Sequence, residues 1–208
     1  PANLTFEQAA AVGVSATTAL QLLRDNGKVQ PGQTVLINGA SGGVGSFAVQ
    51  IAKAFGAEVT GVVSTGKVDL VRSLGADHVV DYTQEDFTRG EQRYDVIVDT
   101  GGNRRLSDLR RALTPRGRLV LVGGETGGRL LGGSERSIRA LALSPLVRQK
   151  LGTFIASENA ADLVVLRDLA EAGRLTPSVD RTYPLSEAAA AVTHVQAGRA
   201  RGKVVIRV

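Results

Sequence analysis

The sequence contains no cysteine, and only two of its 208 residues are histidine. Disulfide bonds and thiolate catalysis are therefore excluded. A structural zinc site needs several Cys or His ligands, so we expect no metal site in this chain. Aromatic residues make up only 4% of the sequence, and the basic residues that give the net charge of +5 are scattered. Without a basic run interleaved with stacking residues, we expect no nucleic-acid partner.

No apolar stretch is long enough to cross a membrane, and the first residues show no signal-peptide pattern. We therefore expect no membrane association and a cytoplasmic location. The length suits one large domain with a single core, which would bury about 70% of the surface of the unfolded chain.

The most informative stretch is residues 34–46, with the sequence TVLINGASGGVGS. An apolar run at 35–37 predicts a buried strand, and apolar residues at helical intervals up to Phe55 predict the helix that follows. Between them Ala40, Gly42 and Gly45 have the spacing of a G-x-G-x-x-G turn, with alanine in place of the first glycine. Such a turn lets the backbone approach a pyrophosphate at the start of a helix. The stretch therefore predicts a dinucleotide-binding turn.

Two other motifs overlap this region. Residues 39–43 match G-x-S-x-G, the nucleophile turn of α/β-hydrolases, and Asp162 and His194 follow in the chain order of a catalytic triad. We disfavour a hydrolase because the turn follows the first strand, and nothing before it could supply an oxyanion loop. Residues 61–67 resemble a phosphate-binding P-loop, but Val68 stands where a magnesium-binding hydroxyl is needed.

Strand and helix patterns alternate along the chain. We expect strands at 35–37, 58–63, 78–81, 94–99, 118–122 and 151–156. Besides the helix that follows the glycine turn and ends at 55, we expect helices at 5–25, 67–74, 104–113, 135–147 and 159–172. This alternation predicts an α/β fold of the Rossmann type, with a doubly wound parallel sheet of six strands. The first helix should break within residues 12–18, which are poor helix formers. A glycine-rich loop at 123–133 is expected to cover a ligand.

The C-terminal end differs from the rest. A helix at 187–196 precedes a final strand at 202–208, and the sequence shows no sheet neighbour for that strand.

Most of the chain resembles the cofactor-binding half of a medium-chain dehydrogenase/reductase of the quinone oxidoreductase (zeta-crystallin-like) branch. The matching segments are residues 4–10, 15–20, 39–45, 74–78, 99–102, 119–124 and 201–206. The resemblance implies an NADP-binding domain at 1–180, with 1–26 as an inter-domain helix. It also implies that residues 181–208 would return to a GroES-like N-terminal catalytic domain, which this sequence lacks.

The end of the second expected strand indicates which nucleotide is bound. NAD sites usually place Asp or Glu there, about 20 residues after the glycines. Here the sequence reads Ser64-Thr-Gly-Lys67, with no acid. Hydroxyls and a lysine favour a 2′-phosphate through charge-assisted hydrogen bonds. In the family that this chain resembles, residues at the positions of Lys67 and Tyr82 contact that phosphate, so we expect NADPH (NADP+) rather than NADH.

The resemblance implies further cofactor contacts. Those expected at the pyrophosphate are Ser41, Gly42, Gly43 and Val44, and those at the ends of the fourth and fifth strands are Thr100, Gly101, Val122 and Gly123. Thr18 and Phe154 would lie near the nicotinamide, and Lys203 would reach the cofactor. Alternatives stay open for these three residues: Thr18 bonded to a helix carbonyl, Phe154 in the core, and Lys203 on a strand surface. Asp99 is interpreted as structural, and no acid–base catalyst is identified.

The expected function is an NADPH-dependent oxidoreductase that transfers hydride to a small-molecule quinone, enone or carbonyl, with this chain as its cofactor-binding part. The alternative is a free-standing NADPH-binding module without catalysis. The sixth strand, at 151–156, should lie at the edge of the sheet. Because a bare edge favours strand pairing, and such pairing occurs in the family, we expect a homodimer through that edge.

Overall fold

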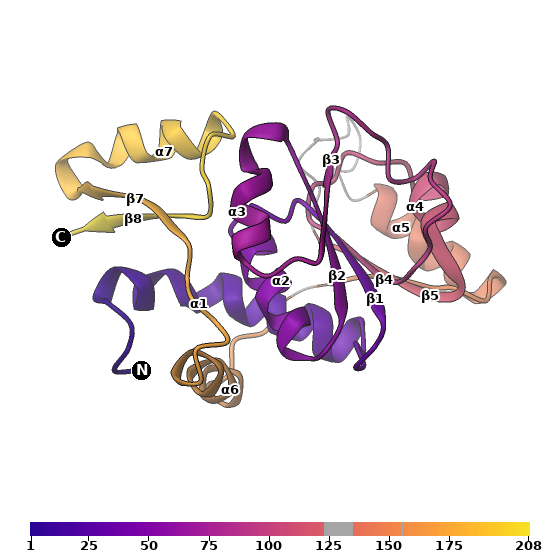
Figure 1. Cartoon of the computed structure of the whole chain (residues 1–208), viewed down its shortest axis with the longest axis horizontal. Coiled ribbons are helices and arrows are strands. Elements are labelled where there is room, and N and C mark those ends of the chain that lie inside the picture. Colours follow the sequence, from indigo (N-terminus) through magenta and orange to yellow (C-terminus); the bar gives the residue numbers. More distant parts are fainter. Residues whose placement is uncertain (123–134, 155) are drawn as a thin grey trace.

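The structure, a computed structural model, describes residues 1–122, 135–154 and 156–208 (Figure 1). Its main sheet has six parallel strands in the order β3-β2-β1-β4-β5-β6. The strands are β1 (Thr34–Asn38), β2 (Glu58–Val63), β3 (His78–Asp81), β4 (Tyr94–Asp99), β5 (Leu113–Leu121) and β6 (Lys150–Thr153). This is the strand order of a Rossmann-type fold, so the predicted fold class is confirmed.

Helices cover both faces of the sheet. They are α1 (Phe6–Gln21), α2 (Gly45–Ala54), α3 (Val68–Ser73), α4 (Leu106–Ala112), α5 (Glu135–Leu143), α6 (Ala160–Glu171) and α7 (Ala188–Gln196). Short helical turns lie at η1 (Leu22–Asn26), η2 (Thr65–Lys67), η3 (Ser144–Leu146) and η4 (Leu185–Glu187). Side chains of α1, α2, α3 and α6 join one core cluster, and side chains of α4 and α5 join a second one.

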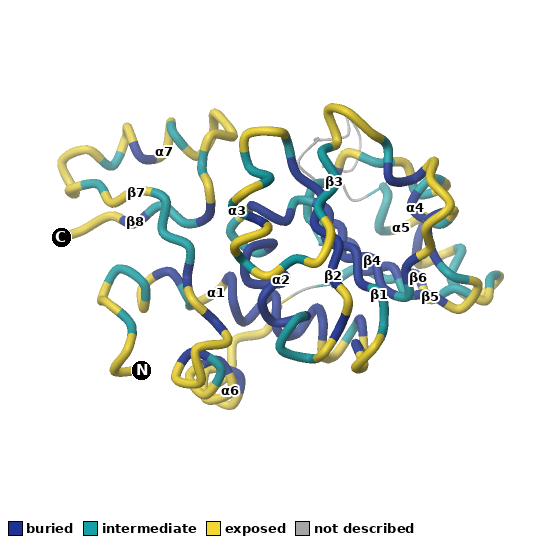
Figure 2. Tube along the Cα trace, in the orientation of Figure 1, coloured by how far each residue is buried: buried dark blue, intermediate teal, exposed yellow. Residues whose placement is uncertain are grey.

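The two core clusters follow from the alternation of side chains along each strand. In β1, Val35 and Ile37 belong to the cluster beneath α1 and α2, whereas Leu36 belongs to the cluster beneath α4 and α5. All three side chains are fully buried. A strand that is apolar on both faces is the mark of a parallel sheet covered by helices on both sides. Figure 2 shows this burial along the central strands and the mostly exposed surface of α7.

Helix α1 begins and breaks where its sequence predicts. Thr5 and Gln8 form a capping box, with the Gln8 backbone N–H donating to Thr5 Oγ1 at 3.2 Å and the Thr5 N–H donating to Gln8 Oε1 at 3.0 Å. The helical path is interrupted at Gly13, inside the expected break at 12–18. The last turn of the expected helix is the π-helical η1.

The structure shows the neighbour of the C-terminal strand that the sequence left unidentified. Strand β8 (Lys203–Arg207) pairs in parallel with β7 (Val179–Pro184) in a separate two-stranded sheet, with α7 between them in the chain. Figure 1 shows this unit beside α1, which contacts both strands. The sequence of β7, VDRTYP, hides the strand because its polar residues and proline give no buried alternation. The expected boundary between 180 and 181 falls inside β7.

Several expected boundaries also shift. Strand β5 begins at Leu113 rather than 118 and includes Pro115, with an irregular register opposite β4. Strand β6 ends at Thr153 rather than at 156, and α5 ends at Leu143 with η3 after it. The expected cover loop at 123–133 lies outside the described residues. None of the described helices is long and apolar enough to span a membrane.

The core predicts a clear stability difference between two leucines. Leu36→Ala in β1 removes a fully buried side chain, and we expect it to lower the free energy of unfolding by about 2–5 kcal/mol. Leu163→Ala on α6, where the side chain is 51% exposed, is the matched control and should change it by less than about 1 kcal/mol. Urea unfolding followed by circular dichroism measures both, and equal losses would contradict the core assignment.

Candidate cofactor-binding site

A recess of about 480 Å³ opens at the carboxyl ends of β1, β2 and β4. Ligands of open parallel sheets bind at this edge. Its lining includes the predicted site residues Ser41, Gly42, Gly43, Val44, Ser64, Lys67, Tyr82, Thr100, Gly101 and Val122. The recess therefore brings together residues from the glycine turn and from the ends of β2, β3, β4 and β5.

The glycine turn forms one wall of the recess, and it has no room for a side chain at Gly39 or Gly45. Gly39 has a φ of +87°, and a Cβ there would lie 2.5 Å from Thr100 Oγ1. A Cβ at Gly45 would lie 2.9 Å from the Ala40 Cα. The backbone N–H groups of Gly43 and Val44, just before α2, have no hydrogen-bond partner within the described part of the chain. Unpaired donors at the start of a helix suit an anion.

Lys203, from β8, lies against this turn. Its ammonium donates to Ser15 Oγ at 2.8 Å, and its Nζ is 3.4 Å from where a Cβ on Gly43 would stand. Burial of the ammonium lowers the pKa of Lys203 below its ordinary value. The structure thus places this lysine beside the glycine turn.

The other end of the recess is formed by Ser64, Lys67 and Tyr82. The Lys67 ammonium donates to the carbonyl oxygens of Gly198 and Ala200, at 3.0 and 2.9 Å. Burial is the main cause that lowers the pKa of Lys67, and the negative charge of Asp180 acts in the opposite direction. None of the described residues that line the recess carries a carboxylate. This end of the recess is therefore cationic and rich in hydroxyl groups.

The segment between α7 and β8 closes over the same end. Arg201 donates through Nη2 to the carbonyl oxygen of Gly66 at 2.6 Å. The positive charge of Arg201 also contributes to the lowered pKa of Lys67. Val195 of α7 and Gly202 add to the wall of the recess. These contacts join the C-terminal unit to the end of β2. The sequence pattern gave no sign of them.

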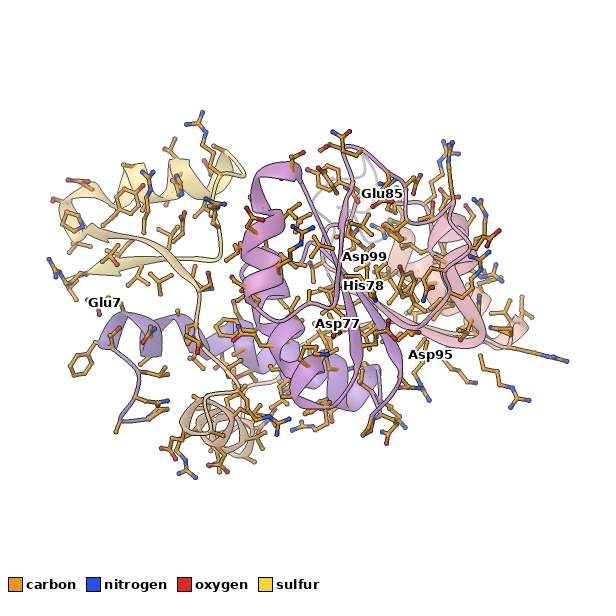
Figure 3. The ribbon with its side chains drawn as sticks, in the orientation of Figure 1. Glu7, Asp77, His78, Glu85, Asp95 and Asp99 are labelled. Atoms are coloured by element: carbon orange, nitrogen blue, oxygen red, sulfur yellow. The ribbon has the colours of Figure 1, made fainter. Side chains whose placement is uncertain are left out.

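A buried polar group fixes the edge of the sheet beside the recess. Asp99, at the end of β4, accepts hydrogen bonds from Asn38 Nδ2 at 2.7 Å and from the Gly102 N–H at 3.3 Å, and it is ion-paired with Arg136 of α5. Figure 3 labels Asp99 among the strands, away from Asp95 at the opposite end of β4. Both oxygens of this carboxylate are bonded to protein groups, consistent with a structural role.

Besides the residues of the C-terminal unit, two polar residues that line the recess were missed by the sequence analysis. Asn38 and Asn103 both line the recess, and Asn38 Nδ2 also donates to Asn103 Oδ1 at 3.3 Å. The available signal was a polar residue at the last position of a buried strand, at the edge where ligands bind.

Three predicted residues, Thr18, Phe154 and Lys203, are not among the described residues that line the recess. Thr18 Oγ1 donates to the Val14 carbonyl at 2.7 Å within α1, which is the alternative that the sequence left open. Phe154 packs against the core cluster beneath α1 and α2. Gly123 lies outside the described residues.

The hydrolase triad is not assembled. Asp162 accepts from Gln21 Nε2 and pairs with Arg24, both at 2.6 Å. His194 pairs with Asp180 at 2.7 Å. Ser41 makes no hydrogen bond to either of the two expected partners in the described structure. The P-loop-like match is also unsupported, because Gly61 lies inside strand β2.

Comparison with known proteins identifies the family. The model of the zinc-binding dehydrogenase family matches residues 74–206. Within the described residues, no group of three or more His, Cys, Asp or Glu side chains could hold a metal ion, so these residues do not form the zinc site that the family's name implies.

Relatives match the chain over nearly its whole length. The mouse (Mus musculus) mitochondrial NAD(P)H oxidoreductase RTN4IP1 is 36% identical over 228 residues, covering 100% of this chain and 57% of the relative. The tomato (Solanum lycopersicum) 2-methylene-furan-3-one reductase is 34% identical, covering 99% of this chain and 48% of the relative. The quinone oxidoreductase structure from Coxiella burnetii superposes with a TM-score of 0.85 at 28% identity, covering 99% of this chain and 62% of that one.

The chain thus spans roughly half to two thirds of the length of these proteins. The match includes the Rossmann-type sheet and the recess at its carboxyl edge. The chain belongs to the zinc-binding dehydrogenase family, within the quinone oxidoreductase-like part of the medium-chain dehydrogenase/reductase superfamily, and corresponds to the cofactor-binding domain.

Proposed function

We propose that this chain binds NADPH, as the cofactor-binding part of an oxidoreductase that reduces a small-molecule quinone, enone or carbonyl. One observation carries the proposal: the recess joins a glycine turn with unpaired N–H groups to an end rich in hydroxyls and cations and without a carboxylate. The names of the relatives, NAD(P)H oxidoreductase and 2-methylene-furan-3-one reductase, support an enzyme rather than a binding module. The expected cytoplasmic location stays a prediction, since the mouse relative is named as mitochondrial.

The pyrophosphate would bind at the glycine turn. The N–H groups of Gly43 and Val44 supply donors, and the positive end of α2 adds an attractive field. The Lys203 ammonium adjoins Gly43 and has only a neutral hydroxyl as its described partner. An anion there would relieve the unfavourable burial of this charge.

The 2′-phosphate would bind between Ser64, Lys67 and Tyr82. An ammonium has three donors, and the two carbonyls of 198 and 200 occupy two of those on Lys67. The third is left for a phosphate oxygen, and the hydroxyls of Ser64 and Tyr82 add further donors. An NADH ribose would gain no ionic contact from this arrangement.

The bound cofactor supplies the hydride, and the residues of this chain position it. Thr100, Gly101 and Val122 lie along the floor of the recess at the ends of β4 and β5. The Thr100 hydroxyl is held by donating to the Asn38 carbonyl at 2.7 Å, which keeps this floor rigid. Thr18 and Phe154 stay predictions for the nicotinamide end, as does Gly123 for the floor. Holding both reactants in a fixed geometry supplies most of the rate in this scheme.

The first test is a calorimetric titration of the chain with NADPH and with NADH. We expect NADPH to bind at least about tenfold more tightly, a difference of about 1.4 kcal/mol, because only NADPH carries the 2′-phosphate. Lys67→Ala should remove this preference while leaving NADH affinity nearly unchanged.

The matched control is Lys150→Ala on β6, an exposed lysine outside the recess. It should leave both affinities unchanged. Equal binding of the two nucleotides by the unaltered chain would overturn the assignment of Ser64, Lys67 and Tyr82. Binding of neither nucleotide would overturn the role of the glycine turn in this chain.

Lys203 gives a second, independent test. Lys203→Met removes a partly buried ammonium but keeps an unbranched side chain, so we expect the free energy of unfolding without nucleotide to stay the same or rise. The same variant should bind NADPH and NADH about tenfold more weakly, since both carry the pyrophosphate. Thermal unfolding with and without nucleotide measures both effects. A destabilised variant with unchanged nucleotide affinity would make Lys203 a purely structural residue.

We also propose that the chain forms a homodimer through the β6 edge. Strand β6 is the last strand of the sheet order, so its outer edge has no partner strand in the described structure. Helix α5 packs against β6, and Ile138, Leu141 and Leu146 of α5 and η3 are at least half exposed. Together the unpaired edge and this apolar strip favour a second copy as the covering partner.

Sedimentation equilibrium tests the dimer. We expect a dimer at micromolar concentration. Leu146→Glu should shift it to monomer, because it places a charge in the apolar strip that the dimer would bury. Leu163→Glu, an exposed leucine on α6, serves as the control and should leave the dimer intact. A monomer at all concentrations, or equal effects of both variants, would count against this interface.

A further inference from the structure

A second recess, of about 460 Å³, lies next to the cofactor recess and shares one residue with it, Asn103. One side is the loop after β3, with Asp86, Thr88 and Arg89. The other side is the turn before α4 and the helix itself, with Asn103, Arg104, Arg105, Asp108 and Arg111. Every residue of this lining is polar or charged. We call it the arginine recess.

Positive charge exceeds negative charge in the arginine recess. It contains the guanidinium groups of four arginines and the carboxylates of two aspartates, which leaves two positive charges without a counterion among the lining residues. Asp86 pairs with Arg104 at 3.2 Å and with Arg89 at 3.6 Å, and Asp108 pairs with Arg111 at 2.9 Å. Arg105 forms no ion pair within the described part of the chain.

One cation of the arginine recess, Arg104, is held in place by the protein. Asp86 is anchored by Thr88, whose N–H and Oγ1 both donate to Asp86 Oδ1, at 3.0 and 2.8 Å. The guanidinium of Arg104 lies 5.5 Å from the centre of the Phe87 ring, and this arginine is largely buried. Each guanidinium has five donors, and the ion pairs use few of them. The remaining donors of Arg104 are therefore positioned before any ligand arrives.

We propose that the arginine recess binds the phosphate group of a small molecule, at a site distinct from the cofactor recess. A phosphate dianion matches both the two excess charges and the planar donor pairs of guanidinium groups. The cations surround a hollow rather than forming a stripe along the surface, which favours a compact anion over an extended polyanion. The site adjoins the cofactor through Asn103 but contains none of the glycine turn.

The test is calorimetric titration of the 208-residue chain with inorganic pyrophosphate at physiological salt. We expect the double variant Arg89→Gln/Arg105→Gln to weaken the pyrophosphate affinity of this site by about tenfold. These two arginines were chosen because both are exposed, and neither contacts Phe87. Thermal unfolding of the variant without ligand should match that of the unaltered chain, which excludes misfolding as the cause.

Arg72→Gln is a matched control. Arg72 pairs with Asp69 at 3.6 Å three residues away on α3, the same distance and spacing as Arg89 with Asp86, but it lies outside the recess. It should bind pyrophosphate as the unaltered chain does. An equal loss in this control, or an unchanged isotherm in the double variant, would overturn the proposal.

Two further titrations show which recess binds pyrophosphate and which class of anion the arginine recess prefers. Saturating NADPH should leave binding to the arginine recess in place, whereas complete displacement would assign pyrophosphate to the glycine turn and overturn the proposal. If NADPH itself does not bind, the comparison of the arginine variants still decides the question. A short single-stranded RNA that binds more tightly than pyrophosphate, and loses that binding in the double variant, would also overturn it in favour of a polyanion surface.

Discussion

The site depends on one close contact, between the end of β1 and the first turn of α2. Backbone packs directly on backbone there, since a Cβ on Gly45 would meet the Ala40 Cα at 2.9 Å and one on Gly39 would meet Thr100. The unpaired N–H groups of 43 and 44 belong to residues that line the recess. The fully buried strands on either side hold this contact rigid, so the same packing that stabilises the fold also shapes the anion site.

The C-terminal unit is the second determinant of the site. By sequence it is an appended helix and strand, but it contributes Lys203 to the glycine turn and two carbonyls to Lys67. Arg201 adds a bond to the Gly66 carbonyl. The recess is therefore closed by residues more than 130 positions away from the end of β2 along the chain. A ligand between these segments would contact both, and so would couple nucleotide binding to the position of β7 and β8.

The sequence predicts the fold well because strands such as β1 and β4 are apolar on both faces and alternate with helices, a pattern specific to parallel sheets. The glycine turn is predicted equally well, because local sterics require glycine at its positions. Strand β7 was missed because pairing with β8, rather than burial of its own side chains, forms it. The bonds of Lys67 and Lys203 were missed for a related reason: they join residues distant in sequence, and periodicity reports only local structure.

The two lysines also show how the site differs from an ordinary surface. Burial lowers the pKa of both, and the described hydrogen bonds of Lys67 go to carbonyls and that of Lys203 to a hydroxyl, not to carboxylates. Asp99, by contrast, is neutralised by Arg136 and turned toward Asn38, away from competition for these cations. Both ammonium groups are partly buried, and the described hydrogen bonds that they donate go to neutral oxygens. Lys67 lines the recess and Lys203 adjoins the glycine turn that forms its wall, so an anionic ligand in the recess would give both of them a negative partner.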